Sequence, residues 1–432
     1  MASLHASVAS TLRWPEANPT SPSARRPRRA QRAGVTVNYV TITVNAVTED
    51  AVENPFVYGE VVPAGAFVDR VDELKRLTAD LLAGQKVFLI SPRRYGKSSL
   101  VSRALASASR SGCLTVEVTV SSYSSYLAFL EGYARAILSA ETRWSKAVTW
   151  LREAIGATRP EVRIESTPDG TSGVAVAFPA IRSARDVARL APEVFALPAR
   201  LADVRGRRVV VALDEFQAVG GFNGGSVEEA LRAAVQHQRQ VGYVFAGSEP
   251  TLMEAMLGPK RPFYKAGPVM RLQKIPAEPF AAFIEQRFAK SGMRVDAGFG
   301  PAVLDLAGHL PYDVQRLAHE TWDDARVAGA RRVGLDHLHA TLRRLLAEQG
   351  VFFETTWERL TLGQRAALRA LVLEDGTGLL SADVRARYRL GGASSVQAAL
   401  GALQREDVVT RDGERWVVVD SLMREWIARR TF

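Results

Sequence analysis

Short apolar runs that alternate with helical patterns are the most regular feature of the chain. Five runs rich in Val, Leu, Ile and Phe end at polar or turn-forming residues; they are 87–90, 114–120, 209–213, 243–246 and 269–272. Between them, apolar residues recur every three or four positions, as in amphipathic helices, over 67–83, 98–108, 126–138, 227–240 and 251–257. This alternation predicts an α/β fold with a parallel sheet covered by helices on both faces.

One long stretch interrupts the alternation. Residues 141–205 contain helical patterns around 144–155 and 184–201, and a polar, glycine-bearing break, Thr-Pro-Asp-Gly-Thr-Ser-Gly, separates them. We interpret this stretch as an insertion into the α/β core.

The pattern becomes helical after the last predicted strand. From 279 to about 349 the apolar spacing is helical throughout. From about Trp357 three short helices lead to a hairpin around Asp412-Gly413, a pair typical of tight hairpin turns, and a helix over 421–430 follows. This order of elements is typical of a winged helix.

The predicted domains are a basic tail (1–50), the core (51–276), a helical lid (277–350) and a winged-helix domain (351–432).

Composition fits a folded protein. The chain has 432 residues, of which 47% are hydrophobic and 24% charged, so wholesale disorder is excluded. No apolar run approaches the roughly 20 residues that cross a bilayer, so we expect no membrane partner. The single cysteine, Cys113, excludes a disulfide framework and a multi-cysteine zinc site, and it favours a cytoplasmic protein.

The net charge of +10 is unevenly distributed. Residues 1–34 carry six Arg against Glu16 alone, which leaves about +5 for the rest of the chain. We favour a slightly basic globular body over a nucleic-acid-binding surface. The tail itself has three interpretations, namely a solvated segment, a basic arm that touches nucleic acid, or sequence upstream of the true start; the first and third are preferred.

Residues 91–98 carry the most specific motif. They read Ser-Pro-Arg-Arg-Tyr-Gly-Lys-Ser and match the phosphate-loop pattern Gly-x-x-x-x-Gly-Lys-Ser/Thr at every fixed position except the first. A predicted strand precedes the motif and a predicted helix follows it, as a phosphate loop requires. The candidate phosphate-binding residues are Ser91, Pro92, Arg93, Arg94, Tyr95, Gly96, Lys97, Ser98 and Ser99.

Each fixed position of the motif has a physical role. Gly96 lets the backbone approach a phosphate closely, and Lys97 can bridge the β- and γ-phosphates. The Ser98 hydroxyl can ligate Mg²⁺, while the start of the following helix directs its positive end at the anion. Ser91 stands at the first position, where a small residue with negative φ is tolerated.

A second acidic signal follows another predicted strand. Residues 209–217 read Val-Val-Val-Ala-Leu-Asp-Glu-Phe-Gln. In a phosphate-loop enzyme, Asp214 would orient Mg²⁺ through water and Glu215 would polarise the attacking water. Acids that merely cap a loop are the alternative, and the phosphate loop upstream makes that alternative less favourable.

Other polar residues have two interpretations each. Ser248, after the fourth strand, could sense the γ-phosphate or cap a loop. Arg261 could act as an arginine finger on a neighbouring subunit of a homo-oligomer, or lie in a surface loop. Pro311 could begin a helix over the base or ribose, and Arg316 could reach the phosphates from the lid. Histidines in the helical regions lack partners at ligand spacing, so no histidine metal site is expected.

Taken in order, six segments resemble a known group, the AAA+ ATPases first noted mainly in archaea, which are close to the STAND NTPases and the origin-recognition ATPases. The segments are FVDRVDEL (67–74), ISPRRYGKSSL (90–100), VVVALDEFQ (209–217), VFAGSEPTLM (244–253), RPFY (261–264) and GHLPYDVQRL (308–317). The likeness covers about 55–350. It implies that ATP and Mg²⁺ bind between the α/β core and the helical lid.

The resemblance also implies residues beyond the phosphate loop. Phe67, Arg70 and Glu73 match a segment near the adenine in that group, where Asp69 replaces the usual Gly. The Gly-His-Leu-Pro at 308–311 is similar to the Gly-x-Pro of STAND lids but one residue longer.

The winged-helix domain has two possible partners. Its candidate recognition helix, 394–406, is poor in basic residues, and 357–432 holds 12 Arg against 10 Asp and Glu. A domain that binds duplex DNA needs more basic residues on its DNA-facing surface, so we favour docking on the core over DNA contact.

The function predicted from the sequence is an ATPase that couples its nucleotide state to the lid and winged helix. The alternative is a nucleotide-gated regulator that binds DNA or a protein and hydrolyses ATP only incidentally. A small-molecule kinase is disfavoured.

Overall fold

The computed structural model describes residues 53–60, 68, 70–140, 150–151, 155, 160–166, 172–222 and 225–430. All of them belong to one unit, Val52–Phe432. The predicted basic tail, Phe67, Asp69 and most of the helix predicted over 144–155 lie outside the described residues.

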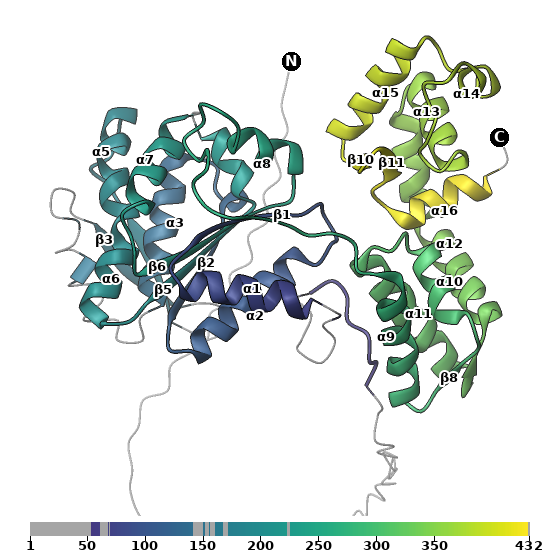
Figure 1. The fold of residues 1–432 in the computed structure, drawn as a ribbon, viewed down its shortest axis with the longest axis horizontal. Coiled ribbons are helices and arrows are strands. Elements are labelled where there is room, and N and C mark those ends of the chain that lie inside the picture. Colours follow the sequence, from purple (N-terminus) through teal and green to yellow (C-terminus); the bar gives the residue numbers. More distant parts are fainter. Residues whose placement is uncertain are drawn as a thin grey trace, which may run out of the picture. The chain divides into compact units, whose positions relative to one another are not determined.

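A parallel sheet organises the core (Figure 1). Among the described residues it has five strands in the order β2-β5-β6-β1-β7, and every neighbouring pair is parallel. The strands are β1 (Lys86–Ile90), β2 (Leu114–Thr119), β5 (Val209–Asp214), β6 (Val241–Gly247) and β7 (Val269–Arg271). Each predicted strand is confirmed to within two residues at either end.

The two faces of the sheet are covered by different helices. Along β1, Val87 and Leu89 pack with α1 (Val71–Leu82) and α2 (Lys97–Arg110), whereas Phe88 and Ile90 belong to the other cluster. That second cluster includes the helices α3 (Tyr126–Ser139), α5 (Ala184–Phe195), α6 (Leu197–Arg205) and α7 (Gly225–Val235). Successive side chains of a strand point to opposite faces. The continuous apolar run of β1 therefore contributes to the apolar cluster on each face of the sheet.

Two helices from the stretch interpreted as an insertion pack against the core sheet. Leu190, Phe195 and Leu201 of α5 and α6 are buried in the same cluster as the sheet. The single helix predicted over 184–201 is two helices, because α6 begins anew with Pro198 in its first turn. The polar break predicted here is flanked by an antiparallel hairpin, β3 (Glu161–Ser166) and β4 (Ser172–Ala177), which the sequence analysis missed.

Other helix ends also differ from the prediction. Helix α1 begins at Val71 rather than at 67, and α7 ends at Val235 rather than at 240. The short helix α8 (Pro250–Met256) follows β6 as expected. Helix ends are poorly defined by apolar spacing alone because the last turns contribute few buried residues.

Helices dominate the rest of the chain. The lid region contains α9 (Ala277–Lys290), α10 (Phe299–Leu306), α11 (Pro311–Val327) and α12 (Leu335–Arg359). It is not entirely helical, since β8 (Arg294–Val295) pairs with β9 (Arg332–Val333); two-residue strands are too short to show a periodicity. Helix α12 runs without a break through the predicted boundary at 350 and 351.

The C-terminal region has the predicted order of elements. Three helices, α13 (Leu362–Leu373), α14 (Ala382–Arg387) and α15 (Ala393–Arg405), precede the hairpin of β10 (Val409–Asp412) and β11 (Arg415–Val418), and α16 (Ser421–Arg429) follows. Within the part of the chain that the structure describes, no helix has the length and apolar character of a membrane span.

Candidate functional site

The loop after β1 runs directly into α2. Gly96 is the N-cap residue of α2 and has φ = 84°, a left-handed conformation that glycine adopts readily. Ser91 directly follows β1 and is buried, and its N–H donates to the carbonyl of Gly247 on β6 at 3.1 Å. Ser91 is not among the residues with positive φ, which explains how serine can occupy the position of the usual glycine.

The loop and the acidic strand end meet across the carboxyl edge of the sheet. The Lys97 ammonium forms a buried ion pair with the Asp214 carboxylate, 117 residues away. The Ser98 hydroxyl donates to the other Asp214 oxygen at 3.2 Å. Lys97 Nζ also lies 3.3 Å from Glu215 Oε1. One ammonium, one hydroxyl and two carboxylates therefore converge at this edge.

Ser248 joins the same group. It follows β6, which lies between β1 and β5, and its hydroxyl donates to Glu215 Oε2 at 2.5 Å. Burial raises the pKa of Glu215, but the Ser248 hydrogen bond and the Lys97 charge outweigh burial, so the pKa lies below its ordinary value. Glu215 is thus an ionised carboxylate at neutral pH.

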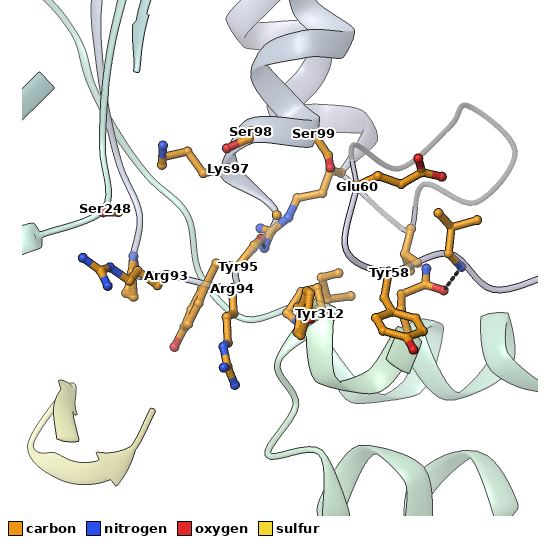
Figure 2. Close-up of a pocket in the computed structure, with 18 of the residues that line it drawn as sticks. Tyr58, Glu60, Arg93, Arg94, Tyr95, Lys97, Ser98, Ser99, Ser248 and Tyr312 are labelled. Carbon is orange, nitrogen blue, oxygen red and sulfur yellow. Dashed lines mark hydrogen bonds between the residues drawn. The ribbon is translucent and has the colours of Figure 1, made fainter. Parts of the chain in front are cut away.

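A cavity opens in front of these residues (Figure 2). Most of the candidate site residues named from the sequence line this cavity: Arg70, Pro92, Arg93, Arg94, Tyr95, Gly96, Lys97, Ser98, Ser99, Glu215, Ser248 and Pro311. Figure 2 shows Lys97 and Ser98 at the start of α2, while Tyr58 and Tyr312 border another part of the cavity. The predicted residues outside the lining are Ser91, Asp214, Arg261 and Arg316.

Residues that the sequence analysis missed form the apolar part of the cavity wall. They include Val57, Tyr58, Ile275, Phe280 and Tyr312. The segment 53–60 is attached to α11, because the Val57 N–H donates to Gln315 Oε1 at 3.3 Å and the Tyr58 hydroxyl donates to Glu320 Oε1 at 2.5 Å. Tyr312 and Gln315 lie within the motif at 308–317, but nothing in the local sequence marks Val57 or Phe280.

Arg70 ties the parts of the cavity wall together. Its buried guanidinium donates to the backbone carbonyls of Tyr95 at 3.2 Å and Gln273 at 2.6 Å, and to Glu73 at 2.9 Å. Arg70 therefore lines the cavity chiefly as a support of the loop, since its donors are directed at the protein.

The two arginines of the loop contact the C-terminal regions. Arg94, itself left-handed with φ = 69°, pairs with Asp313 of α11 at 3.1 Å and with Asp420 at 3.2 Å. Arg93 pairs with Asp407 at 2.8 Å. Asp407 and Asp420 flank the hairpin of the winged helix, so the loop reaches both the lid and the winged helix.

Two predicted arginines have partners elsewhere. Arg261 donates to Glu228 at 2.6 Å, and Glu228 is fully buried. Arg316 donates to the side-chain amide of Gln349, with Nη1 at 3.0 Å, when that amide has the orientation that satisfies both groups. Neither guanidinium lines the cavity within its own chain.

Comparisons with known proteins agree with this architecture. A family described as a probable winged helix domain matches residues 351–429. A Walker-type ATPase of Pyrococcus abyssi is similar in structure with a TM-score of 0.57 and 15% identity, over 85% of this chain and 99% of that chain. For the ORC2 protein of Aeropyrum pernix, solved as ADPNP-ADP complexes, the TM-score is 0.48 at 15% identity, over 88% of this chain and 96% of that chain.

The likeness extends to another kind of protein at a lower score. The RuvB Holliday junction branch migration motor of Thermotoga maritima gives a TM-score of 0.42 at 15% identity, over 82% of this chain and 93% of that chain. The sequence matches none of the curated proteins with which it was compared. The chain thus has the α/β fold of a P-loop ATPase, with a parallel sheet and a C-terminal winged helix.

The burial of the Asp313 carboxyl predicts a specific pH dependence of stability. Burial, with a smaller effect of Asp420, outweighs the Arg94 charge and raises the pKa of Asp313 from 3.8 to about 6. Between these values the folded state keeps a proton that the unfolded state has lost, so the free energy of unfolding falls as the pH rises. Asp313→Asn has no carboxyl to ionise. It should therefore gain stability relative to wild type by up to about 3 kcal/mol between about pH 4 and about pH 7.

Urea denaturation of both proteins over this pH range measures the effect. Parallel stability curves for wild type and Asp313→Asn would show that Asp313 ionises as readily in the folded protein as in the unfolded chain.

Proposed function

We propose that the chain is an AAA+-type ATPase that binds ATP with Mg²⁺ in this cavity and hydrolyses it. In this proposal the nucleotide state is passed to the helical lid and the winged helix. The observation that carries the proposal is the convergence of Lys97, Asp214 and Glu215 at the start of α2.

The loop supplies the groups that a triphosphate needs. The first N–H groups of α2 have no partner inside the helix, and the positive end of the helix dipole attracts an anion. Lys97 is buried, with 6% of its surface exposed, and carboxylates are its ion-pair partners. A buried ammonium needs an anionic partner, and phosphate oxygens can take that place.

Oxygen donors suited to Mg²⁺ lie beside the loop. Ser98 Oγ and Asp214 Oδ2 are 3.2 Å apart, and Mg²⁺ prefers oxygen ligands of this kind, often together with water and substrate phosphates. When bound, the ion supplies charge neutralisation for the phosphates. Ser98 would contribute its hydroxyl, and Asp214 would orient the ion directly or through water.

Glu215 is the group best placed to activate water. It is ionised, half-buried and held at the carboxyl end of β5 by Ser248. An ionised carboxylate in this position can accept a proton from water near the γ-phosphate. Ser248 then serves to hold Glu215, in addition to any contact with the γ-phosphate.

Charge complementarity supports coupling to the winged helix. Basic residues of the core face acidic residues around the hairpin: Arg93 pairs with Asp407, Arg94 with Asp420, and Lys274 with Asp412 at 2.8 Å. Two of these three basic residues belong to the phosphate loop. A change in the loop on nucleotide binding therefore acts directly on the winged-helix contact, and Arg94 transmits the same change to Asp313 of the lid.

The arginines of the winged helix favour this intramolecular role over DNA binding. Arg415 pairs with Asp375 at 2.8 Å and Arg387 with Glu374 at 2.6 Å. The Arg411 guanidinium stacks on Trp416, 4.5 Å from the ring centre. Guanidinium groups already paired within the domain contribute less to phosphate neutralisation, which dominates nucleic-acid affinity.

Replacing Lys97 tests nucleotide binding. Lys97→Ala removes the ammonium that would hold the β- and γ-phosphates, so ATP affinity should fall about 100-fold or more, the loss typical of a buried charged contact. Titration calorimetry with Mg²⁺-ATP measures this loss. The exposed Lys290 on α9 provides the control, and Lys290→Ala should bind ATP as wild type does. Equal affinity in Lys97→Ala and wild type would refute the proposed phosphate site.

Replacing Glu215 separates binding from turnover. Glu215→Gln keeps the size of the side chain and one acceptor oxygen for Gln217 and Ser248 but removes the carboxylate that accepts the proton. ATP binding should persist, and the hydrolysis rate should fall about 100-fold or more, the usual contribution of a general base. Phosphate release under saturating ATP gives the rate. Turnover equal to wild type would reject Glu215 as the base.

Neutralising the winged-helix acids tests the coupling. Asp420→Asn retains the oxygen that caps α16 by accepting from Leu422 and Met423 but removes the charge that faces Arg94. Combined with Asp407→Asn, it should increase hydrogen exchange at 91–96 and 407–412 several-fold and weaken the response of these amides to ATP. Asp375→Asn is the control, because the Arg415 partner of Asp375 lies in the same domain. Unchanged exchange in the double variant would contradict the coupling.

A further inference from the structure

The side chain of Gln217 lies among the polar side chains that follow β5 and β6. It follows Glu215 by two residues in a short 3-10 helix, Phe216–Gly221, and is buried, with 8% of its surface exposed. Its amide nitrogen donates to Glu215 Oε2 at 2.6 Å. The same nitrogen lies 3.3 Å from Ser248 Oγ and 3.4 Å from Glu249 Oε1. One amide therefore contacts three polar groups at the end of β5 and β6.

The two oxygens of Glu215 have different surroundings. Oε2 accepts from both Gln217 and Ser248, whereas Oε1 faces the Lys97 ammonium at 3.3 Å. Two neutral donors on one oxygen oppose rotation of the carboxylate about its terminal bond. Oε1 is thus kept on the side of the phosphate loop, and it becomes available when Lys97 turns to a phosphate.

We propose that Gln217 is a positioning residue for hydrolysis: with Ser248 it fixes Oε2 of Glu215, so that Oε1 is the oxygen that takes the proton of the attacking water. This inference rests on the proposed ATPase function. In the step it serves, the water oxygen bonds to the γ-phosphorus and its proton moves to Oε1. The bond from the γ-phosphorus to the bridging oxygen breaks, and ADP and phosphate are released.

The surroundings of Gln217 argue against a purely structural role. Its carbonyl oxygen is buried and has no hydrogen-bond partner among the described residues. A Cβ at Gly247 would lie 2.8 Å from that oxygen and 2.4 Å from the Met253 side chain, so the glycine leaves room for both. Burying an unpartnered oxygen costs stability. An apolar side chain of the same length would avoid that cost, but it would leave Glu215 Oε2 with one donor fewer.

Gln217→Met provides the direct test, because methionine keeps the length of the side chain and removes both the amide donor and the orphan oxygen. We expect kcat to fall about tenfold or more, as for a modest misplacement of a catalytic group. The KM, the Kd for ATP and the Tm should stay near the wild-type values. A residue whose hydrogen bonds served only stability would instead lower Tm on this substitution and leave kcat intact.

Gln238→Met is the matched control. Gln238 is also a buried glutamine, with 6% exposure, but it lies before β6 at the other edge of the sheet. Its amide donates to the Phe195 carbonyl at 2.7 Å and accepts from the Tyr243 hydroxyl at 2.6 Å. The substitution removes both hydrogen bonds and leaves the Tyr243 hydroxyl only the Tyr133 hydroxyl, 3.4 Å away, so it should lower Tm without changing kcat.

A double-mutant cycle then tests the route through Glu215. If Gln217 acts by positioning Glu215, adding Gln217→Met to Glu215→Gln should cause no further loss in single-turnover hydrolysis. The same fractional loss in both backgrounds would overturn the inference, as would an unchanged kcat in Gln217→Met. Failure of the proposed function is distinguishable, because wild type itself would then neither bind nor hydrolyse ATP.

Discussion

The ion pair between Lys97 and Asp214 constrains the whole carboxyl edge of the sheet. Lys97 lies after β1 and Asp214 is the last residue of β5, and these strands are not neighbours, since β6 separates them. The pair can form only if all three strands end at the same level, which their parallel register ensures. A buried pair of this kind is weak evidence for stability, because desolvation offsets the attraction. Apolar packing on both faces stabilises the sheet that carries the pair, and the position of the pair fits the proposed phosphate site.

The sequence was informative wherever local spacing determines structure. Buried parallel strands read as continuous apolar runs, so the sheet and the acids after 209–213 could be placed in advance. The β3–β4 hairpin was missed because its short alternating pattern lies beside a glycine-bearing break. The cavity wall could not be predicted, since Val57 meets Gln315 across 258 residues of sequence. Gln217 was visible in its motif, but its role depends on a turn that directs it back at Glu215.

The phosphate-loop pattern leaves its middle positions unspecified, and in this chain those positions carry the interdomain contacts. Arg93 and Arg94 face three carboxylates, those of Asp407, Asp313 and Asp420. The exposed Arg93–Asp407 pair contributes little by itself, whereas the Arg94 pairs are better shielded from solvent. From composition alone these arginines belong to a mildly basic surface. In the structure they pair with carboxylates of the same chain. The Arg94 guanidinium contacts both the lid and the winged helix, and Arg93 adds a second contact with the winged helix.

Three unfavourable local features lie at the carboxyl edge of the sheet. Arg94 and Glu215 have positive φ, which costs non-glycine residues free energy, and the Gln217 oxygen is buried without a partner. The strands β1, β5 and β6, which end at this edge, are buried along almost their whole length, and their packing supports the edge. A fold selected only for stability would relieve these costs by conservative substitutions. Their position beside two carboxylates and an ammonium fits the proposed hydrolysis, for which the surrounding residues hold Glu215 in one orientation.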